Sequence, residues 1–202
     1  MDLKSQLLAE RLGAYARLRG GFPIVLAGMV FWLAMAAGGA VMEPIPLLQA
    51  AFGGSGLIFP LALGLAWAFG IPFLKDRTAV SPVLIPAFVS MLLFWPMVFI
   101  AVAEASAGVV LCLLAIGLSI HWPVIGWSYG RAAPFCAHAI ARAGLVFAIF
   151  YAFPDQRFTL IPLAVAAVYG ASALFVWADS GRVARRLGIA APGIKAALPA
   201  AA

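Results

Sequence analysis

Charged side chains are scarce in this sequence, in which only 10% of the 202 residues are Asp, Glu, Lys or Arg. Soluble globular domains carry about 25% charged and about 45–50% apolar residues, whereas 65% of this chain is hydrophobic. A soluble domain of this size still exposes a large surface to water, so it could not hide so much apolar material. The composition excludes a soluble fold and predicts an all-α membrane protein with several transmembrane helices.

Acidic residues are the scarcer charged type, with seven Asp and Glu against 13 Lys and Arg, which gives a net charge of +6. The basic excess does not indicate nucleic-acid binding, because most of these residues lie beside hydrophobic runs, where Lys and Arg set the topology of membrane proteins. We therefore expect membrane lipids as partners and no nucleic acid.

Cysteine and histidine are also rare, with two of each. Cys112 and Cys136 fall in hydrophobic runs at different expected depths, so their Cα atoms would not come within the roughly 7 Å that a disulfide needs. Cys136 and His138 lie two positions apart, which places them on different sides of a helix. A catalytic zinc site needs about three protein ligands, and no acidic residue lies near this pair. The sequence therefore predicts no metal site and no cofactor.

Six runs with few or no charges are long enough to cross a bilayer as helices, which takes about 20 apolar residues. Barrel strands would be shorter and would alternate apolar with polar residues. Prolines inside three of the runs, Pro60, Pro96 and Pro123, are expected to kink them. The predicted transmembrane helices cover residues 22–42, 56–74, 82–103, 107–129, 134–153 and 158–178.

The two ends of the chain, residues 1–21 and 179–202, are expected to lie outside the bilayer. In the first segment, leucines and Tyr15 recur on one helical face among basic residues, which predicts a short amphipathic helix on the cytoplasmic leaflet. The second segment reads as a basic, partly disordered tail. With the N-terminus inside, eleven of the 13 Lys and Arg residues fall on the cytoplasmic side, as the positive-inside rule requires. We predict an inner (cytoplasmic) membrane protein with both termini in the cytoplasm.

Residues 120–144, IHWPVIGWSYGRAAPFCAHAIARAG, contain both histidines and two arginines in an otherwise apolar region. In a helical hairpin that turns near Arg131, His121 and Arg142 both lie roughly 15 Å from the turn at about 1.5 Å per residue. His138 lies four residues before Arg142, on the same helical face. The hairpin therefore predicts a cationic seam between the fourth and fifth spans that opens toward the cytoplasm. The predicted ligand-binding residues are His121, Trp122, Trp127, Ser128, Tyr129, Arg131, His138 and Arg142.

The seam has two interpretations. An arginine in the middle of a membrane costs roughly 2.5–3.5 kcal/mol on the insertion scale and usually faces a partner or a cavity. Because no predicted span contains an acid, an inorganic anion, a carboxylate or a lipid headgroup is the natural complement, and a histidine could gate its binding. Alternatively, Arg142 snorkels to the inner interface, the histidines are satisfied neighbours, and the aromatic residues of the seam belong to packing and to the interfacial belt.

Gly53-Gly54-Ser55-Gly56 imitates the nucleophile turn of rhomboid intramembrane proteases. A serine nucleophile needs a base within hydrogen-bond reach, but Ser55 is expected at the outer end of its helix and both histidines in the inner half of later ones. We predict no catalytic residue and a glycine-rich loop at this position.

A group of short motifs gives the chain a family resemblance: Gly21-Phe22-Pro23, Ala27-Gly28, Phe31-Trp32, Phe94-Trp95-Pro96, and His121 with Gly126-Trp127 and Tyr129. In these motifs, residues 20 to 175 resemble a group of small bacterial multi-pass membrane proteins of unknown function. The resemblance implies an integral membrane protein and supplies no catalytic residues.

The preferred prediction is a protein that binds or transports a small anionic or amphiphilic molecule through the cationic seam, and that associates with itself as a homo-oligomer. A structural or assembly subunit of the membrane is the main alternative. An enzyme that acts on a lipid headgroup, with His121 as acid or base, is disfavoured because no intramembrane acid is available as a second catalytic group.

Overall fold

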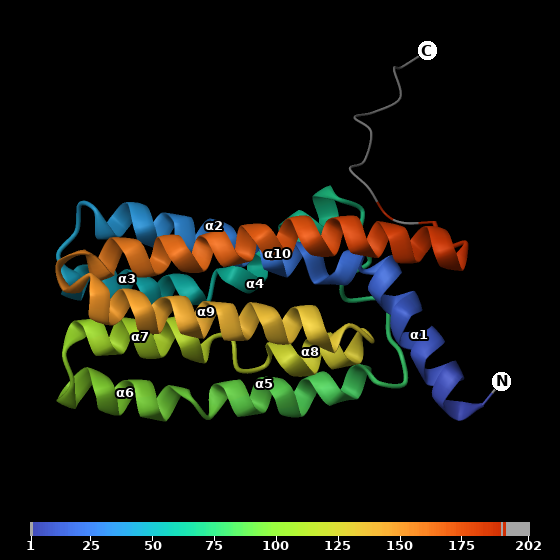
Figure 1. Ribbon diagram of the computed structural model, residues 1–202, viewed down its shortest axis with the longest axis horizontal. Helices are drawn as coiled ribbons and strands as arrows, with labels where there is room; N and C mark the ends of the chain where they lie inside the picture. The colour runs from blue at the N-terminus through green and yellow to red at the C-terminus, as the bar shows by residue number, and fades with distance from the viewer. Residues whose placement is uncertain (1, 191, 193–202) are drawn as a thin grey trace, which may run out of the picture.

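The computed structural model describes residues 2–190 and 192, and all regular structure within this part of the chain is helical (Figure 1). The predicted all-α class is therefore confirmed. The prediction of a partly disordered tail concerns mainly residue 191 and residues 193–202, which lie outside the described residues.

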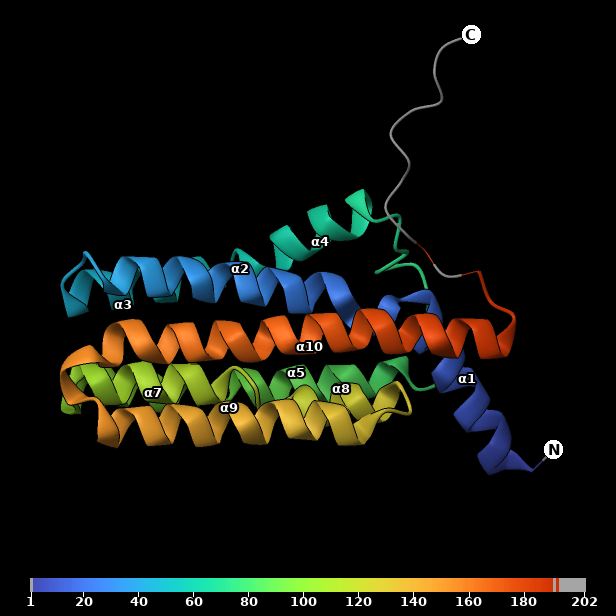
Figure 2. The same ribbon diagram turned by 45° about the horizontal axis from the view of Figure 1, so that its top comes forward.

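The N-terminal helix α1 (Leu3–Arg17) projects from one end of the helical bundle (Figures 1 and 2). Its N-cap is Asp2, whose carboxylate accepts a hydrogen bond from the backbone N–H of Ser5 at 2.8 Å; such caps satisfy a donor that the first helical turn leaves free. Buried residues gather in the second half of α1, around Tyr15, whereas Leu3 is 79% exposed. The buried residues of α1 are therefore in its second half, which packs against the bundle.

A sharp turn joins α1 to α2 (Phe22–Gly39) through the short 3-10 helix η1 (Arg19–Gly21). Gly20 and Gly21 adopt positive φ angles of 61° and 74°, a conformation that glycine reaches without steric cost. The first predicted span, residues 22–42, corresponds to α2.

The second predicted span differs from the structure. Residues 43–55, which the sequence suggested to be a loop, form helix α3 (Pro44–Ser55), and α4 (Ile58–Ala68) follows after a bend of 50°. Pro44 begins α3 because proline is well suited to the first turn of a helix. The glycine-rich stretch, expected to be a loop, instead forms the last turn of α3, and the helix breaks at Gly56. Helices α3 and α4 together form one bent helix pair, and α4 diverges from the bundle in Figure 2.

The next two predicted spans are both broken. The 3-10 helix η2 (Ser81–Val83) and α5 (Leu84–Leu92) are followed by α6 (Trp95–Glu104), and α7 (Ala107–Gly117) is followed by α8 (Trp122–Ser128). Each break lies just before a Trp-Pro pair, because a proline ring clashes with the carbonyl one turn earlier. The kinks expected at Pro96 and Pro123 are thus interruptions of the helix. The two broken helices are antiparallel, with α5 packed on α8 and α6 on α7 (Figure 1).

Helices α9 (Ala132–Ala152) and α10 (Arg157–Leu187) complete the bundle, joined by η3 (Pro154–Gln156). Helix α10 packs along the length of α2 (Figure 2). A Cβ atom on Gly28 of α2 would lie 2.5 Å from the ring of Tyr169 on α10, so this glycine permits the close approach. Helix α10 continues to Leu187, beyond the expected end of the last span at residue 178. It therefore includes Asp179, which the sequence had assigned to the tail.

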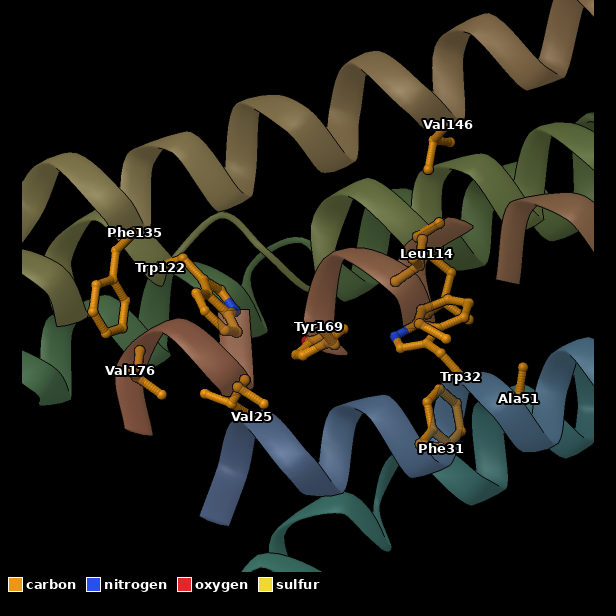
Figure 3. Packing of buried hydrophobic residues seen from close by; sticks show 14 of the residues in the cluster. Val25, Phe31, Trp32, Ala51, Leu114, Trp122, Phe135, Val146, Tyr169 and Val176 are labelled. Atoms are coloured by element: carbon orange, nitrogen blue, oxygen red, sulfur yellow. The ribbon is translucent and has the colours of Figure 1, made fainter. Parts of the chain in front are cut away.

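Within residues 2–190, five helical segments are long and apolar enough to cross a membrane, and the count becomes six if the bent α3–α4 pair forms one span. Large apolar side chains also cover much of the outer surface; Ile85 and Leu174, for example, are 66% and 76% exposed. Exposed apolar area on this scale marks a surface that meets lipid or a partner. The interior holds a contiguous core of aromatic and aliphatic side chains (Figure 3).

Candidate functional site

A buried arginine lies at the centre of the bundle. Arg142 on α9 is 0% exposed, and its Nη1 donates a hydrogen bond of 3.0 Å to the hydroxyl of Tyr169 on α10. The guanidinium carbon lies 5.3 Å from the ring centroid of Trp32 on α2 and 5.2 Å from that of Tyr169. These distances suit cation–π attraction, which is stronger where water is excluded. The side chain therefore points into protein, which contradicts the alternative that it snorkels to the interface.

His138 lies one helical turn before Arg142 and is 4% exposed. Its ring stacks on Trp122 of α8 with a centroid distance of 3.6 Å and an interplanar angle of 2°, and its Nδ1 is 2.7 Å from the hydroxyl of Ser172. It also meets the Tyr169 ring edge-on at 4.9 Å. Tyr169 thus contacts both the histidine and the arginine. In Figure 3 it lies between Trp122 and Trp32.

We call Trp32, Trp122, His138, Arg142 and Tyr169 the arginine centre. Several of its polar atoms have no hydrogen-bond partner within the described part of the chain: Nε and Nη2 of Arg142, Nε2 of His138 and Nε1 of Trp32. Buried polar groups are almost always hydrogen-bonded, and each exception calls for an explanation. Three of these four atoms, the two of Arg142 and the one of Trp32, are always donors, and this spare donor capacity suits an anionic or hydrogen-bond-accepting group.

A groove with a volume of about 390 Å³ opens beside the arginine centre, between α9 and α10. Its polar side chains are His138 and Ser172, with the Trp122 indole at one end, and its walls are small or apolar residues that include Ala137, Ala141, Ala171 and Phe175. The first three of these wall residues are exposed alanines on the outer surface of the bundle. The groove therefore faces outward through an apolar mouth.

His121 occupies the break between α7 and α8, directly before Trp122. Its ring lies 5.5 Å from that of Phe88 on α5, and its Nδ1 is a further buried atom for which the described residues provide no partner. His121 therefore adjoins the arginine centre, because its neighbour in the chain, Trp122, belongs to that centre. It lies in the break between α7 and α8.

The remaining predicted site residues lie elsewhere, in a second cluster at the end of the bundle where α1 docks. Arg131 forms an ion pair with Asp179 of α10 and faces the ring of Tyr15 of α1 at 5.8 Å. Burial alone would lower the pKa of Arg131, but the hydrogen bond and the charge of Asp179 outweigh it and raise the pKa overall. The expectation that the seam lacks an internal carboxylate is therefore wrong for Arg131. The helix that carries its counterion is longer than the predicted span.

Tyr129, Trp127 and Ser128 also belong to this end of the bundle. Tyr129 is buried against Tyr15, with ring centroids 5.7 Å apart. Trp127 lies under the guanidinium of Arg11 at 4.3 Å, and its carbonyl accepts a hydrogen bond from the same side chain. The Ser128 hydroxyl donates to the carbonyl of Ile125 at 2.8 Å, within its own helix. None of these three residues lines the groove.

Two further contacts fasten α1 to the loop between α4 and α5. The Arg17 guanidinium donates to both carboxylate oxygens of Asp76, at 2.6 and 3.0 Å, and the Glu10 carboxylate accepts from the backbone N–H of Ala79 at 2.7 Å. The bond to Asp76 raises the pKa of Arg17. We call this set of contacts the α1 clasp. With Tyr15 and Tyr129, it covers the end of the seam that was expected to open toward the cytoplasm.

The structure therefore divides the predicted seam. His138, Arg142 and Trp122 meet in the arginine centre with His121 beside them, whereas Arg131, Trp127, Ser128 and Tyr129 contribute to the docking of α1. Sequence reasoning missed Trp32, Tyr169 and Ser172, which come from α2 and α10. One signal in the sequence could have indicated two of them: Tyr169 and Ser172 are polar residues three positions apart in an apolar run, so they lie on one face of α10.

The chain is a multi-pass membrane protein, because it has several long apolar helices and an outer surface covered with large apolar side chains around a buried polar centre. Residues 8–179 match a family of unknown function, DUF7010, and because the match covers most of the chain, the protein belongs to that family. No curated protein and no solved structure matches it. Function must therefore be argued from the site alone.

Proposed function

We propose that this protein binds or transports a small anionic or amphiphilic molecule at the arginine centre, between α8, α9 and α10. The observation that carries the proposal is the burial of Arg142 without an ion-pair partner. None of the seven acidic residues, all of which lie in the described part of the chain, forms an ion pair with it. A buried charge left without a counterion costs several kcal/mol, and an anionic ligand would offset that cost.

The aromatic neighbours of Arg142 offset only part of the cost of burying its charge, so they do not remove the need for an anionic ligand. Cation–π contacts with Trp32 and Tyr169 contribute about 0.5–2 kcal/mol each, which is less than the cost of burying an unpaired guanidinium. They hold the guanidinium plane while leaving Nε and Nη2 free to donate. An arginine fork of this kind suits a carboxylate or a phosphate, which it binds through two parallel hydrogen bonds.

The distribution of Lys and Arg supports an orientation with both termini in the cytoplasm, as in the predicted topology. The α1 clasp and the Arg131–Asp179 pair would then lie at the cytoplasmic end, and the loop after Glu104 would face outward.

The test is thermal unfolding of the purified protein in the presence of decanoate, inorganic phosphate or neutral decanol. A ligand at 100 times its Kd stabilises the folded state by about 2.7 kcal/mol. We expect at least one of the two anions to raise the unfolding temperature of the parent protein and decanol to raise it less. In an Arg142→Gln variant the anion effect should disappear.

Arg186→Gln is the matched control, because Arg186 is an exposed arginine at the end of α10 and its loss changes the net charge equally. It should respond to anions as the parent does. If Arg142→Gln unfolds, Arg142→Lys keeps the charge but loses the fork, and should show a weaker anion response. An equal response in the parent and in both Arg142 variants would contradict the proposal and favour a structural role for the arginine.

A further inference from the structure

The shape and lining of the groove between α9 and α10 indicate how a ligand reaches the arginine centre. Building on the proposed function, we infer that the ligand is a long-chain carboxylate that enters the groove sideways from the lipid bilayer. Its carboxylate meets His138 and Ser172, and its acyl chain lies along the apolar walls.

The first support is the position of the mouth. Ala137, Ala141 and Ala171 line the groove and are exposed on the outside of the bundle, where Ile140 and Leu174 beside them are 72% and 76% exposed. A surface this apolar would contact the acyl chains of the bilayer. No charged side chain lines the groove. A water-borne anion would have to cross lipid to reach it, whereas a membrane-dissolved amphiphile is already there.

The second support is the closure of the other route. Tyr15 of α1 is 0% exposed and packs on Tyr129, which is 8% exposed. Beside them the Arg131–Asp179 ion pair joins the start of α9 to α10. These residues fill the end of the bundle along which a polar ligand would otherwise approach the arginine centre from water.

The third support is the polar content of the groove. His138, at 4% exposure, lines the groove and pairs through its Nδ1 with the Ser172 hydroxyl at 2.7 Å, while its Nε2 is buried behind the ring. When the Nδ1–H of His138 donates to the Ser172 oxygen, the Ser172 hydroxyl is free to donate to one oxygen of a carboxylate. A phosphate headgroup has more oxygens to satisfy and is usually held by several Arg or backbone donors, which this lining lacks. Arg142, joined to His138 through Tyr169, supplies positive charge behind the pair.

The size of the groove suits one chain. On α10 the lining runs from Val168 to Val176, about 12 Å at 1.5 Å per residue. A volume of about 390 Å³ lies at the small end of ligand sites, which span about 300–1,000 Å³. It would admit one acyl segment and a small head, and a two-chain lipid would not fit.

The experiment is quenching of tryptophan fluorescence by dibromostearate in protein reconstituted into lipid nanodiscs. Bromine atoms quench only nearby indoles, and Trp122 lines the groove. We expect a saturable component of quenching in the parent, above the background from surface indoles such as Trp67, which is 75% exposed, and this component should be lost in Trp122→Phe. It should weaken at least fivefold in Ala171→Leu, whose side chain fills the groove.

Ala167→Leu is the matched control, because Ala167 is an exposed alanine one turn earlier on α10 that does not line the groove. It should be quenched like the parent. Ala137→Leu, on the opposite wall, is the second blocking variant if Ala171→Leu fails to fold. The methyl ester of the probe and a dibrominated lysophosphatidylglycerol should both bind at least fivefold more weakly than the free carboxylate.

Equal quenching in the parent and in both blocking variants would overturn the inference, as would equal binding of the ester or the lysolipid. The inference and the proposed function can fail separately. If phosphate stabilises the protein through Arg142 but dibromostearate does not bind the groove, the ligand is a polar anion and only the lateral route is lost. If no anion stabilises the protein in a way that depends on Arg142, both the proposed function and the inference are wrong.

Discussion

The contact between Gly28 and Tyr169 allows a sharp test of how the arginine centre is held. Replacing Gly28 with alanine places a methyl group 2.5 Å from the Tyr169 ring, closer than atoms can approach, so the ring or the helix must move. Overpacking of this kind costs about 1–3 kcal/mol. If the ring moves, its hydroxyl also leaves Arg142, and a hydrogen bond to a charged group contributes about 1.5–3 kcal/mol. Alanine regains up to about 1 kcal/mol of helix propensity.

We therefore expect Gly28→Ala to lower the free energy of unfolding by about 1.5–5 kcal/mol, which combines overpacking and the lost hydrogen bond and subtracts the gain in helix propensity. The assay is unfolding of the purified protein by SDS titration, followed by tryptophan fluorescence. Gly144→Ala is the control, because nothing lies within 4 Å of a Cβ added at Gly144 on α9. That variant should be as stable as the parent or slightly more stable.

A double-mutant cycle identifies the partner in the clash. In a Tyr169→Ala background the added methyl group has room, so Gly28→Ala should cost less than about 0.5 kcal/mol, the level at which independent sites add. If Gly28→Ala proves as harmless as Gly144→Ala in the parent protein, the close approach of α2 and α10 is wrong. The arrangement around Arg142 would then have to be revised.

Three further predictions concern the ends of the bundle. Asp76→Asn should weaken the α1 clasp by up to about 1 kcal/mol, since its bond to Arg17 is partly exposed, and amide hydrogen exchange in α1 should accelerate about two- to fivefold. Burial, helped by the charge of Asp179, raises the pKa of Tyr15; its docked form is therefore fully stable below the ordinary value of about 10 and loses stability as the pH rises toward the raised value. Alkaline unfolding monitored by circular dichroism should thus shift to higher pH in Tyr15→Phe, and an unchanged midpoint would contradict the burial of this ring. For the proposed topology, after both native cysteines are replaced by alanine, a membrane-impermeant maleimide should label Ser106→Cys in intact cells and Arg77→Cys only after permeabilisation.

The fold was predictable to the extent that the bilayer dictates it. Long apolar runs specify spans because lipid leaves a backbone no alternative to helix, and this signal located α2, α9 and most of α10. It could not define α3, because Pro44 is equally compatible with the end of one element and the start of the next. It also ended α10 at the first charge, whereas a helix that leaves the membrane continues through Asp179 while its side chains find partners.

The site was predictable only along one hairpin. Spacing on a helix brought His138 and Arg142 to one face, and they do share the arginine centre. The expected pairing of His121 with Arg142 across the hairpin assumed continuous helices. The break before Pro123 shifts α8 relative to α7, so Trp122, and not His121, meets the polar residues of α9 by stacking on His138. Trp32 and Tyr169 approach from α2 and α10, and no local pattern reports which distant helices become neighbours. The partners of Arg142 therefore had to come from the structure.

The pairing of α2 with α10 has a consequence for biogenesis. Helix α2 leaves the ribosome well before its main neighbour α10, so it must wait in the bilayer, or at the translocon, while the intervening helices are inserted. During that interval Arg142 has entered with α9 but Tyr169 has not yet been synthesised. Nascent chains stalled before α10 should thus be the form that membrane chaperones and proteases recognise, and early truncations should be degraded rather than accumulate as partial bundles.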